Sequence, residues 1–194
     1  MINLETYDTA LYKMVHLTSK DNDAISKFVV KNPKGFGLQN YLIKWALRDE
    51  EEGLVRTYLI KDKEDGSIVA YFSLRTGLMT QRSSLFHFDT ITGIELANFA
   101  VNDSYRDAHD VMPELGRYVF SSFVYPLVCD ISRYVGASIL YIFSLPEKKL
   151  MGHYEKMGFQ RLPSKMERFI HRHVKPTYDR GCIFMAQRIL QVDR

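Results

Sequence analysis

Ile94-Glu95-Leu96-Ala97-Asn98-Phe99-Ala100-Val101 is the stretch from which the fold can be argued. It is largely apolar, with Thr92-Gly93 before it and Asn102-Asp103-Ser104 after it. An apolar run of this length between turn-forming residues predicts a buried strand. After a loop, Pro113-Glu114-Leu115-Gly116 opens a helical pattern that runs to about residue 134. A strand, a loop and a helix in this order direct free backbone N–H groups at an anion.

Two motifs resemble those of the GNAT superfamily of acyl-CoA N-acyltransferases. Phe99-Ala100-Val101, followed by Tyr105-Arg106 and Leu115-Gly116, resembles the central motif, in which a strand leads into a loop that grips the coenzyme's pyrophosphate. Tyr154-Glu155-Lys156-Met157-Gly158-Phe159 resembles the Phe-Tyr-Glu-Lys-Leu-Gly-Phe signature, with His153 in place of the first Phe. The loop departs from the family pattern, because residues 107–112 replace the expected glycines and only Gly116 remains.

The bulk properties predict one globular domain across residues 1–194. The chain is 46% hydrophobic and 25% charged, and its net charge of +3 is far from that of a dedicated nucleic-acid binder. Cys129 and Cys182 lack a Cys-x-x-Cys spacing, so buried free thiols in a reducing compartment are expected. Neither a signal pattern at the N-terminus nor an apolar run long enough to span a bilayer is present, which predicts a cytoplasmic protein without a membrane anchor.

Alternating and helical patterns follow one another along the whole chain. Strands are expected at 11–17, 55–60, 67–74, 94–101, 138–144, 159–162 and 182–185, and the main helices at 38–48, 113–134 and 146–157. Residues 78–89 are expected to form a loop that continues into an edge strand. This order predicts helices on both faces of a mixed sheet. The resemblance implies the GNAT-type α/β (α+β) form, in which the sheet is mostly antiparallel.

The start of the second long helix is the predicted pyrophosphate site. Pro113 suits the first helical position, and Met112 before it has no capping side chain, so the first-turn N–H groups remain for an anion. Glu114 opposes an anion there, but Arg117 and Arg106 offset it. The resemblance adds Leu115 and Gly116 to this site. The alternative is a plain helix start above a solvated loop.

The resemblance also assigns a role to the strand end. It implies that the backbone of Phe99, Ala100 and Val101 pairs with the pantetheine arm of the coenzyme as an added strand would. The N–H near Val101 then points at the thioester oxygen, which is an oxyanion-hole position. An ordinary central strand is the alternative.

Two residues are candidates for proton transfer. By alternation Glu95 shares a face with Ala97 and Phe99, and desolvation there is expected to raise its pKa into the range of a general base. Its spacing from the strand end resembles that of the catalytic Glu in histone acetyltransferases, whereas the alternative is a strand Glu bonded to a neighbour. Tyr154 matches the Tyr that many family members use to protonate the leaving thiolate, and a core tyrosine is the alternative.

A basic stretch lies near the C-terminus. It contains Lys165, Arg168, His171, Arg172, His173, Lys175 and Arg180. This stretch either lines an acidic acceptor site or touches RNA, or it is a solvated surface loop. His171 and His173 with Cys182 do not form a metal-binding spacing, so no metal is expected.

These observations together predict an N-acetyltransferase that moves an acetyl group from acetyl-CoA directly to an amine. The acceptor is a small molecule, a protein or an aminoacyl-tRNA. The segment from the predicted helix at 38–48 to Leu74 is similar to GNAT toxins, which acetylate aminoacyl-tRNA and pair with an antitoxin. A homodimer is also possible for this family. The rival from another class is a non-catalytic binding module, in which the altered loop has lost the coenzyme.

Overall fold

The computed structural model describes residues 2–82, 87–173 and 181–190 of the chain, with the side chains of 81, 82, 88 and 171–173 excepted. The chain divides into two compact units. Unit 1 comprises Met1–Arg75 and Ala97–Pro126, and unit 2 comprises Thr76–Leu96 and Leu127–Arg194. The boundary between the units crosses two long strands, each of which contributes residues to both.

The described residues form a seven-stranded sheet in the order β1-β2-β3-β4-β5-β7-β6. Its strands are β1 Tyr12–His16, β2 Arg56–Asp62, β3 Ile68–Arg82, β4 Phe88–Val101, β5 Ile139–Ser144, β6 Gln160–Arg161 and β7 Ile183–Arg188. Strand β4 pairs with β5 in parallel, whereas β1–β2, β2–β3, β5–β7 and β6–β7 are antiparallel. The mixed, mostly antiparallel sheet expected of a GNAT-type fold is confirmed.

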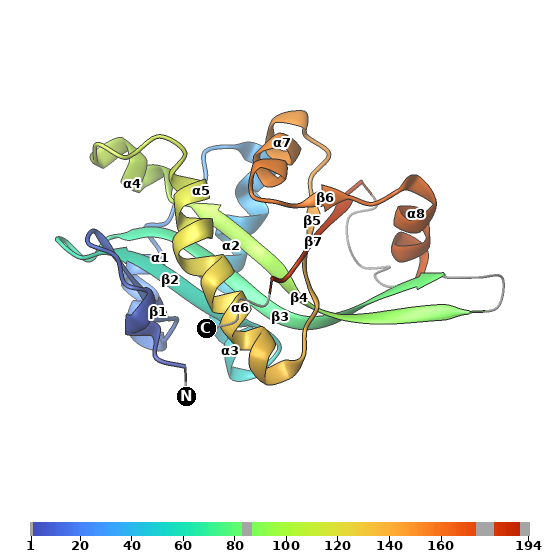
Figure 1. The fold of residues 1–194 in the computed structure, drawn as a ribbon. Coiled ribbons are helices and arrows are strands. Elements are labelled where there is room, and N and C mark those ends of the chain that lie inside the picture. The colour runs from blue at the N-terminus through green and yellow to red at the C-terminus, as the bar shows by residue number, and fades with distance from the viewer. Residues whose placement is uncertain (1, 83–86, 174–180, 191–194) are drawn as a thin grey trace. The chain divides into compact units, whose positions relative to one another are not determined.

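The helices fall between the strands along the chain (Figure 1). They are α1 Asn22–Ile25, α2 Phe36–Lys44, α3 Ala46–Glu51, α4 Asp103–Ala108, α5 Leu115–Val119, α6 Tyr125–Val135, α7 Lys148–Lys156 and α8 Ser164–His173. Short 3₁₀ turns cover Leu4–Tyr7, Ser19–Asp21 and Pro33–Gly35, and a π-helical turn, Phe120–Val124, joins α5 to α6.

Unit 1 has helices on both faces of its strands. On one face, Phe28 after α1 and Leu42 of α2 pack in a cluster with Leu59 of β2 and Tyr71 of β3. On the other face, the ring of Tyr118 in α5 meets a Tyr12 ring of β1 edge-on at 6.1 Å. Figure 1 shows α2 and α5 on opposite faces of these strands. Successive side chains of β2 and β3 point to opposite faces of the sheet, so these strands contribute to the packing on both faces.

Unit 2 is built around β5, which β4 and β7 flank. Its cluster joins Met79 of β3, Tyr141 of β5, Phe184 of β7 and Ile170 of α8. Ile170 is 1% exposed, so α8 buries one apolar face although its sequence is strongly charged. The alternative of a solvated surface loop over Lys165–Arg180 is thus wrong in its conformation up to His173, although Lys165 and Arg168 are exposed, and residues 174–180 lie outside the described chain.

Two expected helices begin or continue differently. The helix expected over 38–48 is interrupted at Trp45, whose φ of −124° leaves the helical region, so α2 and α3 are separate. The helix expected from Pro113 begins at Leu115 and widens at Phe120–Val124, where the Tyr125 N–H donates to the Phe120 carbonyl. Pro126 explains the widening, because it has no N–H to give to the carbonyl four residues earlier.

Two expected loops contain regular structure. Residues 78–82, predicted as loop, continue strand β3. Residues 103–108, also predicted as loop, form helix α4, because the Asn102 side chain accepts a hydrogen bond from the Ser104 N–H and so caps it. Strand pairing decides the structure of the first segment, and helix capping decides that of the second.

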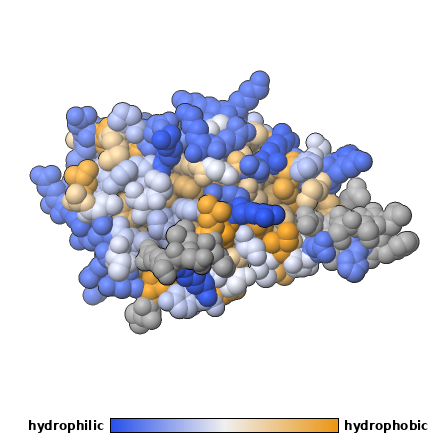
Figure 2. All heavy atoms as spheres, viewed as in Figure 1, coloured by the Kyte–Doolittle hydropathy of each residue, from blue (hydrophilic) through white to orange (hydrophobic). Residues whose placement is uncertain are grey.

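The surface of the described chain is mainly hydrophilic on the face in Figure 2, where hydrophobic residues form small separate groups. Exposed large hydrophobic side chains include those of Phe36, Trp45, Leu54, Leu78 and Tyr134. Among the helices of the described residues, none has the length and apolar character to cross a bilayer.

Candidate active site

Glu95 lies at the last position where β4 pairs with β5, opposite Tyr141. It is 1% exposed, and its Oε2 accepts a hydrogen bond of 3.2 Å from the Tyr141 hydroxyl. Its neighbours in sequence, Ile94 and Leu96, are also buried. Both faces of β4 are therefore covered here, as expected for a strand with a parallel neighbour. The alternation used to place Glu95 on one apolar face does not distinguish the two faces. The burial of Glu95 matches the expectation, while its hydrogen bond with Tyr141 also fits the alternative of a strand Glu bonded to a neighbour.

Sequence reasoning missed Tyr141 and Gly77 as companions of Glu95. The Tyr141 ring stacks on Phe184 at 5.3 Å, which fixes the hydroxyl in place. A Cβ at Gly77 of β3 would overlap that hydroxyl, so only glycine fits beside it. The order of the strands in the sheet brings these residues together, and local sequence patterns do not reveal that order.

Tyr154 lies on α7 and is partly exposed. Its ring meets Phe159 edge-on at 5.8 Å and the ring of His153 at 6.3 Å. Burial of the hydroxyl raises the pKa of Tyr154 to about 12, so the phenol keeps its proton throughout the neutral range. Such a group donates a proton to a leaving anion and does not accept one.

The chain around Tyr154 explains its motif. Helix α7 ends at Lys156 with Met157 as its C-cap, and Gly158 turns the chain with a φ of +94° that favours glycine. Phe159 then enters the core with 1% exposure and holds the Tyr154 ring from the side. The Tyr-Glu-Lys-Met-Gly-Phe motif is thus a helix end that fixes one tyrosine.

In unit 1, β4 ends with Phe99, Ala100 and Val101. Ala100 is 8% exposed and packs in the cluster below α1–α3, while Phe99 and Val101 are half-buried. In the described chain, β4 pairs with β5 only at Gly93–Glu95. Within unit 1, the edge of Ala97–Val101 away from β3 therefore has no strand partner among the described residues.

Asn102 anchors the strand end, which sequence reasoning treated only as a turn signal. Its side chain is buried; Oδ1 accepts from the N–H groups of Val29 and Ser104, and Nδ2 donates to the Ile68 carbonyl. Its own N–H donates to the Val69 carbonyl. One side chain thus fixes the end of β4, the start of β3 and the start of α4.

Arg106 lies on α4 and is half-exposed. Its guanidinium is 3.8 Å from the Asp103 carboxylate, a distance at which an exposed pair interacts weakly. Lys31 contacts the same helix through Asp107 at 2.6 Å, and the Lys31 N–H donates to Asp103. Of the residues that replace the expected glycines, Asp107 and Ala108 therefore belong to a capped helix that is held against the segment before α2.

The start of α5 contains the other predicted pyrophosphate ligands. Glu114 caps it in the left-handed region, with φ +58°, and its carbonyl accepts from the N–H groups of Arg117 and Tyr118. The N–H groups of Leu115 and Gly116 precede these bonds and have no intrahelical acceptor. The Glu114 carboxylate pairs with Arg117 at 2.9 Å, which offsets its charge at the helix start. Pro113 lies outside the helix, contrary to expectation.

The chain was compared with known proteins at three levels. No protein-family model matches it, and no curated protein matches its sequence. Solved structures match nearly its full length. A Tyr-to-Phe mutant of the AtaT toxin is 15% identical, with TM-score 0.67 over 93% of this chain and 91% of that one. A bacterial toxin is 13% identical, with TM-score 0.68 over 92% and 90%.

Further structures carry ligands and partners. A Tyr-to-Phe mutant of KacT is 15% identical, with TM-score 0.64 over 90% of this chain and 94% of that one. AtaT has also been solved with acetyl-methionyl-tRNAfMet, and AtaTR with acetyl-CoA. Another structure contains AtaT with the C-terminus of the antitoxin AtaR. The protein has the GNAT-type fold that it shares with AtaT and KacT.

Proposed function

We propose that the protein is an acetyl-CoA-dependent N-acetyltransferase that transfers the acetyl group directly to an amine, as one domain in the cytoplasm. The observation that carries the proposal is the shared fold, which covers nine-tenths of each chain and includes a structure solved with acetyl-CoA. Tyr154 supports it independently, because it combines the motif resemblance with a partly exposed side chain whose hydroxyl is protonated.

Unit 1 provides the proposed coenzyme site. The first-turn N–H groups of Leu115 and Gly116 bind the pyrophosphate, and Arg106 and Arg117 add positive charge. The side chains of Arg106 and Arg117 are 43% and 51% exposed, and each forms an exposed i,i+3 pair that is weak enough to exchange for phosphate. The unpaired backbone edge at Phe99, Ala100 and Val101 binds the pantetheine arm.

Unit 2 provides the proposed proton-transfer groups. Glu95 accepts the proton that the attacking ammonium must lose, and Tyr154 gives a proton to the CoA thiolate as the tetrahedral intermediate collapses. The amine nitrogen first forms a bond to the acetyl carbon to give this intermediate, and the carbon–sulfur bond breaks when the intermediate collapses. No covalent acyl-enzyme is required.

An aminoacyl-tRNA is the favoured acceptor among the amines considered. The supporting observation is that AtaT, which shares the fold, was solved with acetyl-methionyl-tRNAfMet. The basic residues Lys165 and Arg168 on α8 fit a polyanionic substrate. On this proposal an antitoxin is the partner, as AtaR is for AtaT, and a homodimer is the alternative assembly.

Thermal unfolding with and without acetyl-CoA tests the coenzyme site. Saturating acetyl-CoA should raise Tm, because a ligand that binds the native state stabilises it, by about 2.7 kcal/mol at a hundred times Kd. Arg117→Gln should reduce the shift, while Arg133→Gln, which breaks a comparable i,i+3 pair on α6, should leave it unchanged. An unchanged Tm at millimolar acetyl-CoA would favour the non-catalytic binding module.

Acetyl transfer is then tested with labelled acetyl-CoA and two acceptor sets, charged tRNAs and free amino acids or polyamines. Label should enter the charged tRNA and disappear after deacylation of the tRNA. Label only in the free amines would retain the enzyme but reject the toxin-type acceptor.

A further inference from the structure

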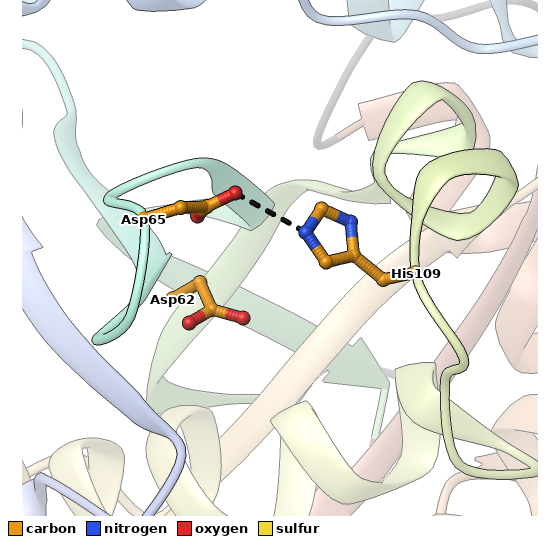
Figure 3. A group of neighbouring side chains, drawn as sticks. All are labelled: Asp62, Asp65 and His109. Carbon is orange, nitrogen blue, oxygen red and sulfur yellow. Dashed lines mark hydrogen bonds and ion pairs between the residues drawn. The ribbon is translucent and has the colours of Figure 1, made fainter.

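The tip of the β2–β3 hairpin and the end of α4, both in unit 1, bring Asp62, Asp65 and His109 together (Figure 3). One ligand atom from each lies within 4.8 Å of the other two. Asp62 and His109 are half-buried and Asp65 is exposed. Asp65 and His109 also line a cleft of about 350 Å³, which gives the group access to solvent.

The ring of His109 has a defined orientation. It stacks on the Tyr105 ring with a centroid separation of 4.1 Å and an interplanar angle of 18°. Its Nδ1 is 3.1 Å from the Tyr105 carbonyl oxygen, and its Nε2 is 3.1 Å from Asp65 Oδ2. A carbonyl oxygen only accepts hydrogen bonds, so the proton of the neutral imidazole belongs on Nδ1.

This tautomer leaves the Nε2 lone pair facing a carboxylate. Asp65 presents acceptor oxygens here, because Oδ1 accepts a hydrogen bond from the Ser67 N–H and Oδ2 accepts one from the Ser67 hydroxyl. Two acceptors at 3.1 Å repel each other unless a positive charge lies between them. That charge is either a second proton on the imidazole or a metal ion.

The surrounding hydrogen bonds favour a metal ion. An Nδ1–H bond to a backbone carbonyl is the contact that orients metal-binding histidines. Asp62 is held by the Tyr105 hydroxyl on Oδ2 and by the Glu64 N–H on Oδ1 at 2.7 Å. Asp65 is held by the Ser67 N–H on Oδ1 and the Ser67 hydroxyl on Oδ2, each at 2.8 Å. All three side chains are thus positioned before any ion arrives.

We propose that Asp62, Asp65 and His109 bind one divalent transition-metal ion of the zinc class, with water from the cleft completing the coordination. Bonds of about 2.0 Å in tetrahedral geometry separate two ligand atoms by roughly 3.3 Å, close to the observed Asp65–His109 distance of 3.1 Å. One imidazole and two carboxylates suit zinc, whereas magnesium and calcium favour oxygen ligands alone. The bound ion joins the hairpin to α4.

Zinc titration by calorimetry on chelator-treated protein at neutral pH tests the site. Wild type should bind one Zn²⁺ per chain, and Mg²⁺ should give no comparable signal. His109→Gln, Asp62→Asn and Asp65→Asn should each weaken zinc binding at least about tenfold. The control His87→Gln, which alters an exposed histidine of unit 2, should retain wild-type affinity.

Thermal unfolding with and without Zn²⁺ separates the metal site from a simple ion pair. Zinc should raise the Tm of wild type and of His87→Gln but not of His109→Gln, and circular dichroism should show that each variant is folded. A wild-type Tm that zinc leaves unchanged would overturn the proposal in favour of an imidazolium–carboxylate pair. Retention of wild-type affinity in His109→Gln would overturn it as well.

Discussion

At the scale of single residues, the hydroxyl of Tyr154 is the proposed proton donor. Tyr154→Phe keeps the ring and its edge contact with Phe159 but removes that hydroxyl. We expect turnover to fall by about 10²–10⁴-fold, while the Tm shift with acetyl-CoA stays at the wild-type value. Full turnover in the variant would show that another group protonates the thiolate.

The pKa of about 12 gives Tyr154 a second signature. A raised tyrosine pKa stabilises the protonated form, so the donor remains available from neutral pH until the pH approaches that value. The rate profile should therefore show no loss from Tyr154 at pH 10, where a free phenol would be half ionised. A falling limb centred near pH 10 that disappears in Tyr154→Phe would contradict the assignment.

The buried carboxylate of Glu95 accepts a hydrogen bond from the Tyr141 hydroxyl. Glu95 therefore has a structural role besides its proposed role as the base. Glu95→Gln preserves an oxygen acceptor for that hydroxyl but removes the base. If Glu95 is the base, kcat falls at least about 100-fold with little change in Tm. Tyr141→Phe serves as the comparison, since it deletes the hydrogen bond and leaves the carboxylate. A larger effect in Tyr141→Phe than in Glu95→Gln would make Glu95 structural.

At the scale of elements, the approach of β3 to the Tyr141 side chain of β5 depends on Gly77. Gly77→Ala places a methyl group where the Tyr141 hydroxyl lies, so the ring or a strand must move. We expect a loss of about 1–3 kcal/mol in the free energy of unfolding, measured by urea denaturation. Gly37→Ala in α2 meets no atom within 4 Å and should be neutral or stabilising by up to about 1 kcal/mol. Equal effects in both variants would argue against the overlap.

Patterns that reside in one element were predictable, and those that depend on pairing were not. The run from Ile94 to Val101 identified β4, and the order of elements identified the sheet. Helix α4 was missed because Asn102 both ends a strand and caps a helix, and the sequence signal for the two is the same. The partner of Glu95 was missed because Tyr141 belongs to a strand that lies 46 residues further along the chain.

At the scale of the whole molecule, the described residues include two cysteines and no disulfide. Cys182 is buried and Cys129 is half-buried. Reductant should leave Tm unchanged, and a thiol reagent should count two thiols in denaturant, with Cys129 reacting first in the native protein. A Tm that falls on reduction would indicate a disulfide and an oxidising compartment instead of the proposed cytoplasm.

The contact between Asp65 and His109 also has a consequence for protein engineering. The β2–β3 turn, with its polar residues and Gly66, resembles the surface turns into which epitopes and reporter domains are usually spliced. Here the turn holds α4 through Asp65 and Asp62, so a splice after Gly66 would pull the hairpin from the helix. The exposed turn at Gly53, where a Cβ meets nothing within 4 Å, is the better point of attachment.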